Sequence, residues 1–199
     1  PANRCVVMLG GEAVQSATAI MPTLSDECWQ YDGLDWSRIA PGGPSARKYH
    51  QMVYDSARER FVVFGGFSWE TLNDTWELRS SGWRKVETLA SPPPRRGFAM
   101  TYDPIARQTL VFGGFPGGDE LWAFDGANWA RVQTTNAPPY REGAGFLYIP
   151  PNRCCLLFGG LSSMLLKDSW ALVRPSPQTV ALLPPPRPEI PPEETIPAP

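Results

Sequence analysis

Phe61-Val62-Val63-Phe64-Gly65-Gly66 is the stretch that decides the fold, because an apolar run followed by two glycines occurs four times in the chain. The other copies are Val6-Val7-Met8-Leu9-Gly10-Gly11, Leu110-Val111-Phe112-Gly113-Gly114 and Leu156-Leu157-Phe158-Gly159-Gly160. Self-similarity at a fixed period is typical of repeat architectures, in which each repeat is one supersecondary unit. The sequence therefore predicts four tandem copies of one unit.

A tryptophan follows each glycine pair at a regular distance. These residues are Trp29, Trp76, Trp122 and Trp170, and they lie 47, 46 and 48 residues apart. A second tryptophan follows seven residues later in three copies, at Trp36, Trp83 and Trp129. The repeat is therefore about 47 residues long, which is within the range of propeller blades.

Each copy contains short strand-like segments joined by turns. Innermost strands are expected at residues 47–55, 95–103 and 141–148, ahead of the last three apolar runs. Asp32-Gly33 and Asp125-Gly126 favour tight hairpins between the two tryptophans of a copy. Four short strands per copy, without helical periodicity, predict an all-β fold made of four-stranded antiparallel β-propeller blades.

The chain resembles the kelch family of β-propellers from residue 1 to about residue 172. The resemblance rests on the apolar run, the glycine pair, an acidic residue two positions before an aromatic residue, and the second tryptophan. It implies a propeller domain over residues 1–174, with blades at 1–40, 41–87, 88–133 and 134–174. It also implies a ring that closes with five to seven blades.

The first and last copies are expected to be incomplete. Residues 1–4 align with the turn between the first and second strands of later copies, so the first blade lacks its innermost strand. Residues 179–183 are expected to form a last fourth strand. The ring is then completed by missing parent sequence or by a second chain, a small four-bladed ring being the alternative.

Residues 175–199 are expected to form a proline-rich tail or linker. Ten of these residues are proline, a composition that favours an extended polyproline conformation. Recognition of this segment by SH3-like domains is the alternative interpretation.

Composition excludes several classes of function. The chain carries 18 basic and 20 acidic residues mixed along its length, so no nucleic-acid partner is expected. No apolar stretch approaches the roughly 18 residues that span a bilayer, so no membrane span is expected. The four cysteines show no C-x-x-C spacing and are expected to be free thiols, and the cellular compartment stays open.

No catalytic or metal site is expected. Copper propellers that resemble galactose oxidase need two histidines, and this chain has only His50, which is expected to pack in the core. The Asp-Gly pairs differ from a sialidase Asp-box, in which one residue separates aspartate and glycine. No paired carboxylates of a glycosidase are evident either. The sequence therefore predicts no cofactor and no enzyme.

Arginines and carboxylates recur in register across the copies. Arg47, Arg95 and Arg141 open the innermost strands, and Glu27, Asp74, Glu120 and Asp168 lie two residues before the first tryptophans. Both positions fall at the same end of an antiparallel blade, so each arginine is expected to meet a carboxylate. The first interpretation is a structural ion pair, and the alternative is a set of arginines that capture an acidic partner from a central channel.

The same end of the blades is predicted to be the binding face, because its loops vary between the copies. Loop residues Ile20, Met21, Met164 and Leu165 are apolar. The candidate binding residues are Phe67, Trp69, Phe115, Tyr140, Arg47, Arg95 and Arg141. The alternative for Trp69 and Phe115 is packing over the blade edge. The repeated tryptophans, with Tyr54, Tyr102 and Tyr148, are expected in the core.

These features predict a non-catalytic propeller that binds a protein or peptide partner through the loops of one face. The alternative is a propeller that binds or modifies carbohydrate, with a glycan as the partner. A third interpretation is a structural fragment with no site of its own.

Overall fold

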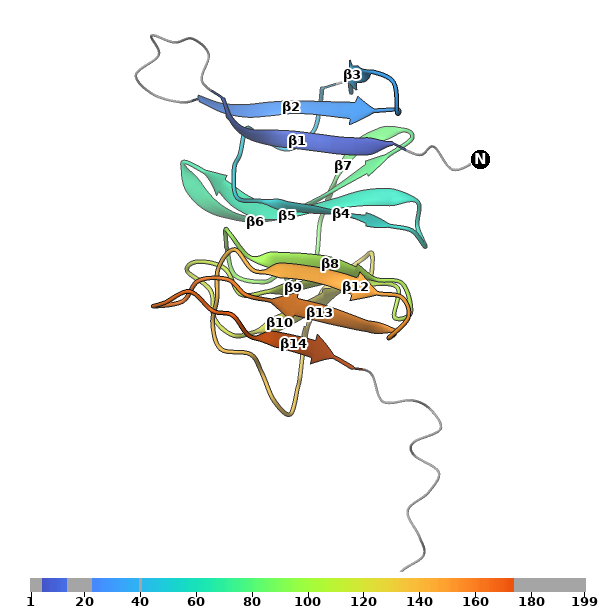
Figure 1. Ribbon diagram of the computed structural model, residues 1–199. Coiled ribbons are helices and arrows are strands. Elements are labelled where there is room, and N and C mark those ends of the chain that lie inside the picture. The colour runs from blue at the N-terminus through green and yellow to red at the C-terminus, as the bar shows by residue number, and fades with distance from the viewer. Residues whose placement is uncertain (1–4, 14–22, 40, 174–199) are drawn as a thin grey trace, which may run out of the picture.

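The computed structural model describes residues 5–13, 23–39 and 41–173. This part of the chain forms four antiparallel sheets that follow one another along the sequence, here called blades 1 to 4 (Figure 1). Blade 1 contains β1 (Val6–Ala13), β2 (Thr23–Tyr31) and β3 (Trp36–Arg38). Blade 2 contains β4 (Gln51–Asp55), β5 (Arg60–Ser68), β6 (Glu70–Arg79) and β7 (Gly82–Val86). The all-β prediction is confirmed.

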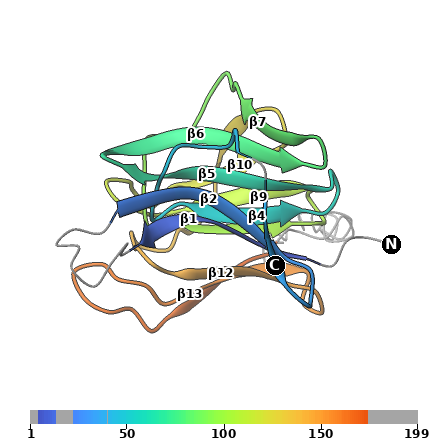
Figure 2. The same ribbon diagram turned by 90° about the horizontal axis from the view of Figure 1, so that it is seen from above.

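Blades 3 and 4 repeat the same meander. Blade 3 contains β8 (Ala99–Asp103), β9 (Gln108–Phe112), β10 (Leu121–Phe124) and β11 (Trp129–Val132). Blade 4 contains β12 (Gly145–Ile149), β13 (Cys154–Phe158) and β14 (Ser169–Leu172). Figure 2 shows the strands of blade 2 placed in the order β4, β5, β6, β7 from the inside outward. Within the described residues no helix is long and apolar enough to cross a membrane.

Among the described residues blade 1 begins with β1, which corresponds to β5 and pairs directly with β2, so the predicted absence of an innermost strand is confirmed for this part of the chain. The strand expected at residues 179–183 and the predicted proline-rich tail lie outside the described residues. The exact boundaries of the predicted domains remain a prediction.

The innermost strands begin later than expected. β4, β8 and β12 begin at Gln51, Ala99 and Gly145 rather than at the repeated arginines. Tyr49, Gly97 and Gly143 adopt left-handed φ values of 58°, 62° and 62°, which a strand cannot accommodate. The arginines therefore precede the strands, on a kinked segment at the end of each blade.

Three hydrophobic clusters join neighbouring blades. Alternate residues of each apolar run point to opposite faces of the sheet, so Val63 packs toward blade 1 while Val62 and Phe64 pack toward blade 3. Leu110 and Phe112 of blade 3 pack in the same way against Cys155 and Leu157 of blade 4. The apolar runs are thus buried on both faces wherever two blades meet.

The two end blades expose the apolar faces that the inner blades bury. Met8 occupies the position of Val63 and is 50% exposed, and Phe158 occupies the position of Phe64 and is 55% exposed. Val6 and Trp36 are exposed on the same outer face of blade 1. The prediction that all repeated aromatic residues are core is therefore wrong for Trp36, because no blade covers its face. It is also wrong for Tyr54, which is exposed on the face of blade 2 that is directed toward blade 1.

Taken by itself, the 199-residue chain is expected to self-associate in solution through these open faces. Exposed contiguous apolar surface favours association, so the protein at micromolar concentration is expected to sediment as a dimer or larger species. Replacing Met8 and Phe158 together with lysine is expected to produce the monomer. A wild-type chain that sediments as a monomer and unfolds cooperatively would contradict the prediction, and Leu34→Lys, a change at an exposed hairpin turn, is the control.

Candidate functional site

The turns that join second and third strands lie at one end of the blades. The segments that lead into the innermost strands lie at the same end, which we call the loop face. The β5–β6 and β13–β14 connections mark it on the left side of Figure 1. The repeated arginines and their carboxylates also lie at this end, because the starts of first and third strands coincide in an antiparallel meander. The loop face contains all the described candidate binding residues.

Each repeated arginine forms an ion pair inside its own blade. Arg47 binds Asp74 through two bonds of 2.7 and 2.8 Å, and Arg141 binds Asp168 through two bonds of 2.8 and 3.0 Å. In blade 3, Arg95 contacts Glu120 at 3.5 Å. The predicted arginine–carboxylate contacts are confirmed in the three blades that carry the arginine.

Further hydrogen bonds use the remaining groups of each ion pair. The Nη1 of Arg47 donates to the carbonyl of Gly65 at 3.0 Å, and its Nε donates to the carbonyl of Ser45 at 3.0 Å. The indole of Trp76 donates to Asp74 at 2.7 Å. Burial alone would raise the pKa of Asp74, but the hydrogen bond and the charge of Arg47 outweigh it and lower that pKa. Blades 3 and 4 repeat these arginine–carbonyl and indole–carboxylate bonds.

The repeated arginines are buried, which corrects the interpretation that they capture an acidic partner. Arg47, Arg95 and Arg141 are 1%, 0% and 1% exposed. Their charged groups are directed into the blade rather than toward a central channel. There they bind the carboxylate and backbone carbonyls. Because a ligand cannot reach them without unfolding the blade end, their role is to hold the glycine pair and the third strand together.

The residues that follow the repeated arginines are accessible and differ between blades. Lys48, Arg96 and Glu142 occupy this position. Each exchanges two backbone hydrogen bonds of 2.8–3.0 Å with a residue just past the glycine pair. Those partners are Phe67, Phe115 and Leu161. The backbone is thus the same in all three blades, while the side chains presented on the loop face change.

Arg96 lies between two aromatic rings from neighbouring blades. Its guanidinium carbon is 4.9 Å from the ring centre of Phe67 and 5.0 Å from that of Phe115. Arg96 forms no ion pair or side-chain hydrogen bond with a described residue. The rings hold the guanidinium in place through cation–π contacts and leave its N–H groups available.

Tyr49 breaks the repeat beside this cluster. Gly97 and Gly143 stand at the same position in blades 3 and 4, and backbone bonds of 3.0 and 2.7 Å join Gly97 to Tyr49 and Gly143 to Gly97. Only glycine adopts the left-handed region without strain, yet Tyr49 has φ 58° and an exposed ring. Strained residues of this kind concentrate at functional sites.

Trp69 is the most exposed tryptophan of the described chain. It forms the tip of the β5–β6 hairpin with φ 63° and is 90% exposed, so the alternative that it packs over the blade edge is wrong. Phe115 is also exposed, whereas Phe67 is half-buried beneath Arg96. We call Tyr49, Phe67, Trp69, Arg96 and Phe115 the aromatic surface.

The other predicted residues of the loop face belong to different segments of the chain. The hydroxyl of Tyr140 donates to Glu142 at 2.7 Å, and burial together with Glu142 raises the pKa of Tyr140 to about 12. Met164 and Leu165 are exposed in the β13–β14 connection. Ile20 and Met21 lie outside the described residues.

Sequence reasoning missed Tyr49 and Arg96. Aligning the three copies at the repeated arginines would have shown a tyrosine where the other blades have glycine, which is a sign of a strained, exposed residue. No signal in the sequence pairs Arg96 with Phe67, because the two residues belong to different blades.

The described residues bring together no group of three or more histidine, cysteine, aspartate or glutamate side chains arranged to hold a metal. His50 is partly buried near the glycine pairs of blades 1 and 2, and its Nδ1 has no hydrogen-bond partner among the described residues. Burial and the charge of Arg47 lower the pKa of His50 to about 4.

An apolar hollow that is open to solvent lies between blades 3 and 4. Its walls include Phe112, Leu121, Leu157 and Trp170, which belong to the cluster that joins these two blades. It borders Leu172 in β14, the last described strand, next to the place of the expected fourth strand of blade 4.

Comparisons with known proteins agree with this architecture. The family model described as the KLHDC2/KLHL20/DRC7 Kelch-repeats domain matches residues 2–179. The solved structure titled "Structure of YjhT" is similar with a TM-score of 0.60 and 14% sequence identity, covering 78% of this chain and 56% of that one. The chain thus spans just over half the length of YjhT, and the similarity concerns the fold.

Proposed function

Because the chain belongs to the kelch-repeat family, we propose that it is a non-catalytic interaction module whose aromatic surface binds a segment of a partner protein. The observation that carries the proposal is Arg96, held between Phe67 and Phe115 with no carboxylate partner in the described chain. A guanidinium that is already oriented loses little freedom when it binds a carboxylate through two hydrogen bonds.

The surroundings of Arg96 indicate the chemistry of the partner segment. Phe115 offers an exposed ring in contact with Arg96, and Trp69 offers an exposed ring at the tip of the β5–β6 hairpin. Tyr49 offers a third ring near Lys48. Aromatic residues and arginine are the residue types that contribute most binding energy at protein interfaces. The proposed partner segment therefore presents an apolar side chain next to an aspartate, a glutamate or a chain-terminal carboxylate.

Replacing Trp69 or Arg96 tests this proposal. Peptides are selected from a displayed library on the purified protein, and their affinities are measured by fluorescence anisotropy. Trp69→Ala and Arg96→Gln are each expected to weaken binding about tenfold or more, which corresponds to about 1.4 kcal/mol. Leu34→Ala removes an equally exposed apolar side chain from a hairpin turn and is expected to leave affinity unchanged. Selected peptides that bind both loop-face variants like the wild type would refute the proposal.

Carbohydrate binding is the second candidate, and it is favoured by Trp69 alone. An exposed ring with nothing above it is able to stack on a sugar, and this residue stands outside the repeat pattern. A glycan array probed with the wild-type protein and Trp69→Ala separates the two candidates. Glycan binding that needs Trp69 but not Arg96 would support this function in place of the peptide.

A further inference from the structure

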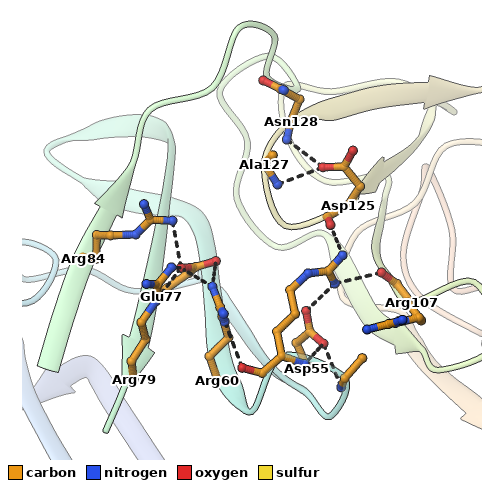
Figure 3. A network of polar contacts seen from close by, with 11 residues as sticks. Asp55, Arg60, Glu77, Arg79, Arg84, Arg107, Asp125, Ala127 and Asn128 are labelled. Atoms are coloured by element: carbon orange, nitrogen blue, oxygen red, sulfur yellow. Dashed lines mark hydrogen bonds and ion pairs between the residues drawn. The ribbon is translucent and has the colours of Figure 1, made fainter. Parts of the chain in front are cut away.

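A second group of charged residues lies on the face of blade 2 that is directed toward blade 3, away from the aromatic surface. Glu77 in β6 is surrounded by Arg60 from β5, Arg79 from β6 and Arg84 from β7 (Figure 3). Glu77 pairs with Arg84 across the β6–β7 ladder, and Arg79 follows two residues later, so all four side chains share one face of the sheet. We call these three arginines the arginine cluster.

The carboxylate of Glu77 is fully buried and receives bonds from every member of the cluster. Arg60 donates to both oxygens at 3.1 and 3.0 Å, and Arg84 donates to Oε2 at 3.1 Å. Arg79 donates to the same oxygen from Nε at 3.0 Å and also from Nη2. Burial would raise the pKa of Glu77, but these donors lower it, so the carboxylate is ionised.

The cluster therefore places three guanidinium groups around one carboxylate. These four side chains together carry an excess of two positive charges. Two further carboxylates drawn in Figure 3 bind other groups. Asp55 binds Arg58 at 2.8 Å, and Asp125 accepts the backbone N–H groups of Ala127 and Asn128 at 2.8 Å. Figure 3 shows these groups beside the cluster, on the blade 3 side.

The arginine cluster also keeps unused donors. Arg84 is half-exposed and, among the described residues, donates only from Nη2. No described acceptor binds Nη1 of Arg79 or Nη2 of Arg60, and both side chains remain partly exposed. Several guanidinium N–H groups from three strands thus remain available around one buried carboxylate.

The cluster has no counterpart in the other blades. The pair formed by Glu77 and Arg84 in blade 2 corresponds to Gln30 and Ser37 in blade 1. In blade 3 the corresponding pair is Ala123 and Ala130. Gln108 stands in place of Arg60 in blade 3. A group of ion pairs that only holds strands together is expected to occur in every blade, as the buried arginine–carboxylate pairs do wherever the arginine is present. This cluster is instead a feature of one blade.

We propose that the arginine cluster binds a phosphate dianion. Two negative charges match the two excess positive charges, and the tetrahedral oxygens accept several N–H bonds from differently oriented guanidinium groups. Glu77 keeps the three arginines together in the absence of the anion, so the site is formed before the anion binds. The phosphate is either free or carried by a phosphorylated side chain.

Calorimetric titration of the protein with inorganic phosphate, at constant ionic strength in a phosphate-free buffer, tests the proposal. Saturable binding is expected, and Arg84→Gln is expected to weaken it about tenfold or more. Arg131→Gln serves as the control, because Arg131 is equally exposed on a neighbouring blade but has a single carboxylate partner at 3.3 Å.

A second titration, with a short peptide that carries phosphoserine, identifies the source of the phosphate. Tighter binding than for inorganic phosphate would assign the site to a phosphorylated side chain, and equal binding would assign it to free phosphate. Absence of saturable phosphate binding, or equal binding by wild type, Arg84→Gln and Arg131→Gln, would overturn the proposal. Because Arg84 is half-exposed, Arg84→Gln is expected to fold, which its thermal unfolding curve verifies.

Discussion

Replacing Arg47 with alanine is expected to lower the free energy of unfolding by about 3–5 kcal/mol, the range measured when one partner of a buried ion pair is removed. The substitution leaves Asp74 without its cation and removes the donors to the carbonyls of Ser45 and Gly65. It also opens a space where a fully buried side chain had packed. Urea unfolding monitored by tryptophan fluorescence measures the change.

The matched control is Arg38→Ala, which removes an exposed arginine from its ion pair with Glu27 at 3.1 Å. Exposed pairs contribute little, so a loss below about 1 kcal/mol is expected. The ion pair between Arg47 and Asp74 is also expected to keep stabilising the folded state at acidic pH. Because the pKa of folded Asp74 lies below its ordinary value of 3.8, its stabilisation is complete above that value and is lost as the pH falls through the folded pKa. Equal losses for the two arginine variants would contradict the structural role of Arg47.

Gly113→Ala is expected to destabilise the protein by about 2–5 kcal/mol. A left-handed alanine costs about 1–2 kcal/mol, and Gly113 has φ 69°. A Cβ at this position would also lie 2.3 Å from the carbonyl oxygen of Arg141, so the two blades would have to separate. Crowding of this kind adds about 1–3 kcal/mol. Urea unfolding again provides the measurement.

Gly159→Ala separates the two contributions. Gly159 has the same place in its repeat and φ 61°, but the nearest atom to an added Cβ is the Leu166 carbonyl oxygen at 3.4 Å. Only the backbone cost of about 1–2 kcal/mol is therefore expected. If Gly159→Ala proved as damaging as Gly113→Ala, the contact between blades 3 and 4 would not be the reason for the glycine.

The aromatic surface illustrates how far a sequence alone predicts a site. Trp69, Phe67 and Phe115 were candidates because they stand in the segments after the glycine pairs, which vary between the copies. Arg95 was selected in place of its neighbour Arg96, because regular spacing marks the repeated residue. Burial makes Arg96 the accessible residue of the two. The repeated Arg95 is enclosed by its blade, whereas Arg96, the residue after it, reaches the surface.

The arginine cluster was not predicted, although each of its members is visible in the sequence. Arg60, Arg79 and Arg84 lie on three different strands, and the register of two ladders brings them to one carboxylate. A shift of one residue in either ladder would turn some of these side chains to the opposite face of the sheet.

By itself, the sequence determined the repeat, the all-β class, the correspondence of β1 to the second strand of the other blades, and the pairing of each repeated arginine with a carboxylate. These features follow from local patterns: apolar runs, glycine pairs and residue spacing within one blade. Only the tertiary structure decided which residues are exposed. The apolar run of an end blade is identical in kind to that of an inner blade, yet Met8 and Phe158 are open while Val63 and Phe64 are buried. Exposure depends on whether another blade covers the face, and the contacts that cover it join residues far apart in the chain.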